Sequence, residues 1–239
     1  MSKIDARDRL MVALDVPDAR AAEILLDQLH DSVQIVKIGL ELFTSAGPAI
    51  VKLALERGKQ VFLDLKFFDI DETVKRATAR SADLGVQFLT VHAHRKTMQA
   101  AVEGKRAQPE LKILAVTVLT NFDVQDVQES GSTWSVSELV VARAKAAAEV
   151  GCEGVVASGQ EPKAIRQAVG QTLVIVTPGV RPDGAETHDQ ARVSTPTQAI
   201  EQGSDYLVVG RPIRDADDPH AAAQAIVSEM QVAFDRRTR

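Results

Sequence analysis

The chain has 239 residues, of which 45% are hydrophobic, 26% are charged and only 4% are aromatic. This composition excludes a disordered or low-complexity chain, and the net charge of −5 has the wrong sign for a protein that neutralises nucleic-acid phosphates. The single cysteine, Cys152, excludes a disulfide framework and a Cys-X-X-Cys metal site. No apolar run approaches the length of a transmembrane helix, and the N-terminal MSKIDARDRL lacks the apolar stretch of a signal peptide. We therefore expect a cytoplasmic protein that binds neither nucleic acid nor a membrane.

One sequence pattern occurs four times: an Ala-rich amphipathic segment, an acidic residue, a glycine and then a short apolar run. The glycine suits the left-handed position just past the end of a helix, and the apolar run has the length and composition of a buried strand. The four pairs are Gly58 with VFLDL, Gly85 with FLTVH, Gly151 with GVVAS, and Gly203 with YLVVG. The pattern predicts helices that alternate with strands.

Four further apolar runs, at residues 10–15, 34–39, 112–118 and 173–178, bring the predicted strands to eight. Eight strands alternating with helices in a chain of this length predict an α/β protein with a closed (β/α)8 TIM barrel. No linker rich in Pro, Gly or Ser interrupts the series, so we expect a single domain over residues 1–239. An open doubly wound sheet is the alternative, but its GxGxxG phosphate fingerprint is absent after the first predicted strand.

The predicted strand ends are unusually rich in charge, and reactive groups lie at the C-terminal ends of strands in barrels of this kind. Asp15 ends the first strand and Lys37 lies in the second. The third strand ends in Asp64 and Lys66, with Asp69 just beyond; the first two are two residues apart and should point the same way. A single buried ion pair would be read most simply as structural. Several charges converging from different strands favour a functional site, because burying charge is costly.

Two predicted connections, residues 119–135 and 177–195, are longer than typical loops of such barrels, which indicates a lid or a binding loop. The second follows the seventh strand and should face the end of the eighth, where barrels of this kind commonly bind phosphate. A solvated surface loop is the alternative. The candidate anion-binding residues of this region are Arg181, Gln190, Gly210 and Arg211.

His92 and His94 form a His-X-His pair at the end of the fourth predicted strand, which could supply half of a zinc site. No further histidine or acidic cluster of suitable spacing accompanies the pair, and Cys152 is alone. We therefore predict that the protein holds no metal.

The segment DLKFFDIDETV, residues 64–74, resembles the signature of the orotidine 5′-phosphate decarboxylase family, a DxKxxD core within DLKxHDIPxTV. Sugar-phosphate decarboxylases of the same superfamily share the DxKxxD core. They are not expected to carry a second motif, VKxGxELF, whose lysine is Lys37 in this chain. The chain departs from the family pattern at Phe68, where histidine is common, and at Asp71, where proline is common; the added negative charge could weaken binding of an anionic substrate. The further matches are ALD with Asp15, VKIGLELF with Lys37, AVTVLT with Thr120, TPGVRP with Arg181, DQARV with Gln190, and VVGRPI with Gly210 and Arg211.

The resemblance implies decarboxylation of orotidine 5′-phosphate to uridine 5′-phosphate, the last step of de novo pyrimidine nucleotide synthesis, without a cofactor. It implies that Lys66 protonates C6 of the pyrimidine within a charge network of Lys37, Asp64, Lys66 and Asp69. It further implies that Asp15 and Lys37 hold the ribose hydroxyls, that Thr120 lies by the pyrimidine, and that Gln190, Gly210 and Arg211, with Arg181 nearby, bind the phosphate. In the family Asp69 and Thr73 reach the neighbouring subunit's site, which implies a homodimer.

The implied reaction is electrostatically demanding. Loss of CO₂ from C6 leaves a carbanion that the ring cannot delocalise, so a protein without a cofactor must stabilise it with fixed charge, here the Lys66 ammonium. A carboxylate of Asp64 or Asp69 about 4 Å from the substrate carboxylate would repel it by roughly 4 kcal/mol at an effective dielectric constant of about 20. That repulsion is relieved as CO₂ leaves.

Two other functions stay open at this point. In a Schiff-base aldolase, Lys37 or Lys66 would attack a carbonyl as an uncharged amine, whereas Asp64 and Asp69 should keep Lys66 charged. A nucleotide-binding barrel that has lost catalysis would be expected to lack part of the charged core, and all of that core is present.

Overall fold

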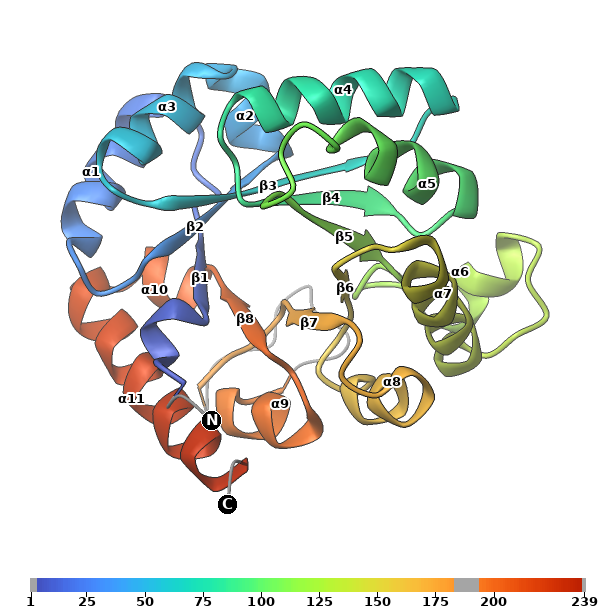
Figure 1. Cartoon of the computed structure of the whole chain (residues 1–239). Coiled ribbons are helices and arrows are strands. Elements are labelled where there is room, and N and C mark those ends of the chain that lie inside the picture. The colour runs from blue at the N-terminus through green and yellow to red at the C-terminus, as the bar shows by residue number, and fades with distance from the viewer. Residues whose placement is uncertain (1–3, 183–193, 238–239) are drawn as a thin grey trace.

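Eight parallel strands close into one barrel in the computed structural model, which describes residues 4–182 and 194–237 (Figure 1). Each strand pairs with the next along the chain, and the last pairs with the first through Val209 and Val12. The strands are β1 (Leu10–Ala13), β2 (Ile35–Gly39), β3 (Gln60–Phe67), β4 (Phe88–His92), β5 (Lys112–Val116), β6 (Gly154–Val156), β7 (Val174–Thr177) and β8 (Tyr206–Val209). All eight predicted strands are present, and the predicted (β/α)8 fold is confirmed.

Helices surround the barrel on its outside (Figure 1). They are the 3-10 helix η1 (Ala6–Asp8), α1 (Ala19–Leu29), α2 (Leu40–Ala46), α3 (Ala49–Glu56), α4 (Asp71–Asp83), α5 (Arg95–Gly104), α6 (Val124–Glu129), α7 (Val136–Val150), α8 (Pro162–Val169), α9 (Pro196–Gln202), α10 (Arg211–Arg214) and α11 (Pro219–Arg237). Gln231 on α11 accepts a hydrogen bond from the amide of Ala6 and donates one to the carbonyl of Ile4, each at 3.0 Å. The last helix is thereby tied to the first turn of the chain. Among the described helices, none is long and apolar enough to cross a membrane.

The glycines of the repeated pattern adopt the conformation that the pattern predicts. Their φ angles are +71° at Gly58, +83° at Gly85, +85° at Gly151 and +115° at Gly203. A side chain with a Cβ atom would be strained at such angles, so glycine allows the chain to leave each helix and turn directly into the next strand.

Side chains along the strands alternate between two apolar layers. Those that point outward, such as Val61 and Leu63 on β3, pack beneath the helices. Those that point inward fill the barrel: Met11, Ala13, Ile35, Phe62, Phe88, Leu114, Val176, Tyr206 and Val208. The next inward positions toward the C-terminal ends are Asp64 on β3 and Thr90 on β4, so the barrel interior changes from apolar to polar at its mouth.

Strand β3 is irregular where it carries the charged residues. Between residues 63 and 67 it advances four positions while β4 advances only two, from Leu89 to Val91. Two extra residues therefore form a bulge in β3, and Lys66 within it has a left-handed φ of +49°. Asp64 and Lys66 reach the same mouth, as predicted, although the bulge interrupts the regular backbone pairing of β3 with β4.

The two long connections differ in what the structure describes. Residues 119–135 contain α6, so they are not a bare loop. In the second connection, Val180 forms an isolated bridge with Ser194, and the Arg181 amide donates to the Ser194 carbonyl at 3.0 Å. Gln190 lies outside the described residues.

Candidate active site

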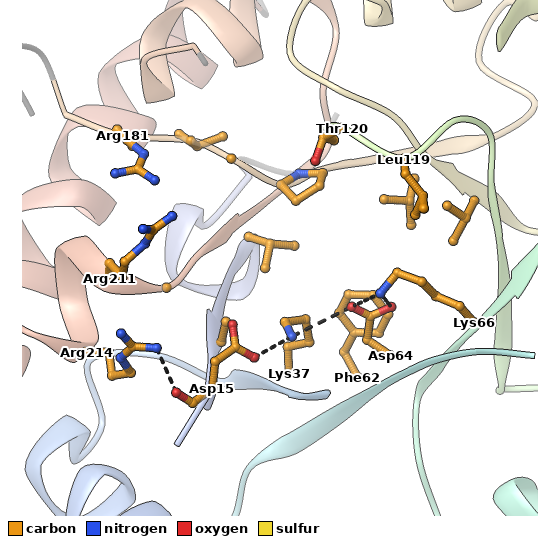
Figure 2. A pocket seen from close by; sticks show the side chains of 18 of the residues that line it. Asp15, Lys37, Phe62, Asp64, Lys66, Leu119, Thr120, Arg181, Arg211 and Arg214 are labelled. Atoms are coloured by element: carbon orange, nitrogen blue, oxygen red, sulfur yellow. Dashed lines mark hydrogen bonds and ion pairs between the residues drawn. The ribbon is translucent and has the colours of Figure 1, made fainter. Parts of the chain in front are cut away.

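A pocket of about 490 Å³ opens at the C-terminal mouth of the barrel (Figure 2). Its apolar lining includes Phe62, Val116 and Val156 from three different strands. The predicted site residues that line it are Asp15, Lys37, Asp64, Lys66, Thr120, Arg181, Gly210 and Arg211. The barrel thus brings into one cavity residues that lie far apart in the sequence.

Four charged side chains form a continuous series of contacts across this pocket (Figure 2). Lys37 Nζ lies 2.8 Å from Asp15 Oδ1 and 3.7 Å from Asp64 Oδ2. Lys66 Nζ donates to both carboxylate oxygens of Asp64, each at 2.9 Å. The side chains of Lys37 and Asp64 are only 10% and 14% exposed. Each of these two most buried charges therefore lies between two groups of opposite charge, which offset the cost of its burial.

Asp64 is ionised despite its burial. Burial alone disfavours the charged form, but the ammonium groups of Lys37 and Lys66, with hydrogen bonds from Lys66 and the Thr90 hydroxyl, hold the pKa of Asp64 below its ordinary value. A carboxylate with a lowered pKa stabilises the fold at neutral pH, and it loses that contribution only as the pH falls through the lowered value. The pocket therefore holds a fixed negative charge between two positive ones at physiological pH.

Three arginines, Arg181, Arg211 and Arg214, lie at the opposite end of the pocket from Lys66 (Figure 2). Arg214 donates to the backbone carbonyl of Asp15 at 2.7 Å and bonds both carboxylate oxygens of Asp215. The planar guanidinium group matches the geometry of phosphate oxygens, and several such groups together suit a dianion. This end of the pocket is therefore suited to a phosphate.

The two histidines of the His-X-His pair lie outside the pocket. The ring of Phe68, 61% exposed, contacts both of them, with centroids 5.6 Å from His92 and 4.6 Å from His94. Burial first, and nearby positive charge second, lower the pKa of both histidines, so they are neutral at pH 7. Among the described residues, no three His, Cys, Asp or Glu side chains are grouped so that they could hold a metal ion.

Residues 8–226 match the family described as "Orotidine 5'-phosphate decarboxylase / HUMPS family". The chain belongs to this family. It is 49% identical over 227 residues to the orotidine 5′-phosphate decarboxylase of Rhodopseudomonas palustris strain BisA53, which covers 95% of this chain and 96% of that protein. It is 50% identical over 229 residues to the enzyme of the same name from Nitrobacter winogradskyi, and that alignment covers 96% of this chain and 95% of the relative. The crystal structure of the orotidine 5′-phosphate decarboxylase from Lactobacillus acidophilus superposes with a TM-score of 0.82 at 36% identity and covers 93% of this chain and 99% of that one.

The family membership confirms the resemblance that the sequence motifs indicate, but not every residue of those motifs lies in the pocket. Asp69 and Thr73 are exposed and do not line the pocket of their own chain. Asp69 Oδ1 instead accepts a hydrogen bond from the Ile70 amide at 2.6 Å. Asp71, a departure from the family motif, begins α4, where an acidic residue favours the helix, and it too lies outside this pocket.

The sequence motifs did not single out Arg214, a charged residue of the pocket, or Gly39, a glycine beside the charged residues. Arg214 lines the pocket, and its position three residues after Arg211, on the same side of a helix, was the available signal. Gly39 lies beside the charged residues: a Cβ atom there would lie 2.9 Å from Lys37 Nζ and 3.3 Å from Asp15 Oδ1. Glycine at this position therefore leaves the space that the ion pair occupies.

Proposed function

We propose that this chain decarboxylates orotidine 5′-phosphate to uridine 5′-phosphate without a cofactor, the last step of de novo pyrimidine nucleotide synthesis, as a single-domain cytoplasmic enzyme. Relatives that are 49% to 50% identical over nearly the whole chain carry the name of this activity. The observation that carries the proposal is the Lys66 ammonium, which is held by both oxygens of an ionised and largely buried Asp64 at the end of the pocket opposite the arginines.

The pocket offers a partner for each part of the substrate. Its arginine end suits the 5′-phosphate, its middle offers charged groups for hydroxyls, and its far end offers an ammonium. The proposed contacts are Arg181, Gln190, Gly210 and Arg211 with the phosphate, Asp15 and Lys37 with the ribose hydroxyls, and Thr120 with the pyrimidine.

In the proposed reaction the bond between C6 and the carboxylate breaks, the electron pair stays on C6, and CO₂ departs. Lys66 then gives a proton to C6, and its neutral amine regains one from solvent. The fixed ammonium stabilises the charge as it develops, and Asp64 holds the ammonium so that little reorganisation is needed. The negative charge of Asp64 also repels the substrate carboxylate, by roughly 4 kcal/mol for charges about 4 Å apart at an effective dielectric constant of about 20, until CO₂ leaves.

The alternatives have less support. A sugar-phosphate decarboxylase of the superfamily is not expected to carry Lys37, which here contacts both Asp15 and Asp64. A Schiff-base aldolase needs an uncharged amine, whereas the Lys66 ammonium donates hydrogen bonds to both oxygens of the ionised Asp64 carboxylate.

The test is an absorbance assay on the purified chain. With orotidine 5′-phosphate, a metal chelator and no added cofactor, we expect the orotate absorbance to disappear as uridine 5′-phosphate forms. Folded protein that leaves the absorbance unchanged would contradict the proposal. Activity that the chelator abolishes and a metal restores would contradict its cofactor-free form.

We further propose that the active unit is a homodimer in which Asp69 and Thr73 enter the partner's pocket. Asp69 is flanked by Phe68 and Ile70, which are 61% and 73% exposed. Leu40, which follows the neighbouring strand β2, is 57% exposed. Large apolar side chains exposed on adjacent connections suit burial against a second copy of the chain, and such burial would carry Asp69 with it.

Replacement of Arg211 by alanine is expected to lower kcat/KM for the phosphorylated substrate by on the order of 100- to 1000-fold, because a desolvated charge pair is lost. The phosphate-free nucleoside should be turned over about as slowly by the variant as by the wild type, since it never used this contact. Steady-state kinetics with both substrates measure the difference.

The matched control is Arg236→Ala, which removes an exposed arginine of α11 from an ion pair with Glu201. This control should leave the kinetics with both substrates unchanged. Equal losses for nucleotide and nucleoside in Arg211→Ala would mean that Arg211 is structural.

A further inference from the structure

Thr90 lies on β4 opposite the bulge of β3 and contacts both charged residues of that bulge. Its hydroxyl accepts a hydrogen bond from the Lys66 amide and donates one to Asp64 Oδ1, each at 2.9 Å. These directions are fixed, because an amide N–H can only donate and an ionised carboxylate can only accept. Thr90 is 0% exposed, so bulk solvent does not compete for its hydroxyl.

The bond to the Lys66 amide replaces one that the bulge removes. In a regular sheet, an amide that faces the neighbouring strand pairs with a backbone carbonyl of that strand. Here the threonine side chain accepts that hydrogen bond. Lys66 also has a φ of +49°, which a residue with a side chain adopts only where its surroundings hold it. The Thr90 hydroxyl is therefore an anchor for the strained backbone that carries the ammonium.

The bond to Asp64 closes a ring of three contacts. The Lys66 amide donates to the Thr90 hydroxyl, the hydroxyl donates to Asp64 Oδ1, and the same oxygen accepts a hydrogen bond from Lys66 Nζ at 2.9 Å. The backbone and the side-chain nitrogen of Lys66 are thus fixed relative to one carboxylate. Since threonine is branched at Cβ, its hydroxyl has few alternative orientations.

We propose that Thr90 is a positioning residue of the reaction, whose hydroxyl holds the Lys66 backbone in its left-handed conformation and aligns Asp64, so that the ammonium is aimed at the reacting carbon. This inference rests on the proposed decarboxylase function. Thr90 lines no part of the pocket, so it acts through Lys66 and Asp64 and not through the substrate.

The test compares Thr90→Val, which keeps the shape and removes the hydroxyl, with Thr90→Ser, which keeps the hydroxyl. The control is Thr117→Val: Thr117 is also 0% exposed in the barrel wall, but its hydroxyl donates at 2.9 Å to the carbonyl of Val156. We expect Thr90→Val to lower kcat by about 10- to 100-fold, as a small misplacement of a catalytic group does, with little change in KM or in the affinity for uridine 5′-phosphate. Thr90→Ser should recover most of the lost kcat, and Thr117→Val should keep wild-type kinetics.

A wild-type kcat in Thr90→Val would overturn the inference. So would a loss of kcat that Thr90→Ser does not recover, or one that comes with an equal loss of affinity for uridine 5′-phosphate. Melting temperatures of all variants separate misfolding from misplacement. If Thr90→Val melts far below Thr117→Val, Thr90→Ala takes its place in the comparison with Thr90→Ser. An inactive wild-type chain would refute the proposed function itself, which is a different outcome from active chains that do not respond to loss of the hydroxyl.

Discussion

Replacement of Lys66 by alanine is expected to lower kcat by about 10,000-fold or more, because one group supplies both the proton and the fixed positive charge of the proposed transition state. Binding of uridine 5′-phosphate should stay measurable, since the arginine end of the pocket is unchanged. The absorbance assay gives kcat, and calorimetric titration with the product gives the affinity.

The matched control for this variant is Lys52→Ala on α3, where the lysine side chain is 80% exposed and pairs with Glu56 across one helical turn. Its kinetics should equal those of the wild type. Substantial turnover by Lys66→Ala would remove Lys66 from the role of proton donor, and loss of product binding would show that the substitution disrupts the whole pocket.

Mixed dimers of Lys66→Ala and Asp69→Ala chains are expected to recover activity, although each variant alone should be nearly inactive. If Asp69 enters the partner's pocket, each mixed dimer has one site with both residues intact. Equal refolding of the two chains makes half of the dimers mixed, so about a quarter of all sites should be wild type. The recovered activity is measured after the two unfolded chains are refolded together, with mass spectrometry to confirm that mixed dimers form.

The control for this experiment is a mixture of Lys66→Ala and Asp64→Ala chains. Asp64 and Lys66 belong to the same chain's pocket, where they contact each other directly. No arrangement of these two chains restores a complete site, so their mixture should stay inactive. An inactive Lys66→Ala and Asp69→Ala mixture, with mixed dimers present, would refute the shared site.

The barrel could be predicted because the signals for its helices and strands are short, local patterns in the sequence. Glycines such as Gly58 and Gly151 end helices, and apolar runs mark buried strands. Eight strands that alternate with helices leave few ways to bury all of the strands. The clustering of charged residues at the barrel mouth then follows, because the parallel strands of one barrel all end on the same side. Both predictions depend on periodicity and order, which a single sequence carries.

The detailed path of the charged contacts could not be predicted in the same way. The bulge in β3 is a mismatch between two strands, and no pattern within DLKFF records how many residues of β3 oppose those of β4. The role of Thr90 depends on that mismatch, because its hydroxyl meets the Lys66 amide only where the regular ladder fails. A lone hydroxyl in the apolar run FLTVH was the one visible signal, and it reads equally well as ordinary strand composition.

The most direct test of the proposed chemistry is to run the reaction in D₂O on chelator-treated protein and to measure both released CO₂ and the isotope content of the product. We expect one CO₂ for each uridine 5′-phosphate formed and one deuterium at C6, because the proton that Lys66 delivers exchanges with solvent. Folded protein that releases no CO₂ would refute the proposed chemistry. A borohydride-trapped adduct on Lys37 or Lys66 with a keto substrate would also refute it and would assign the pocket to Schiff-base chemistry.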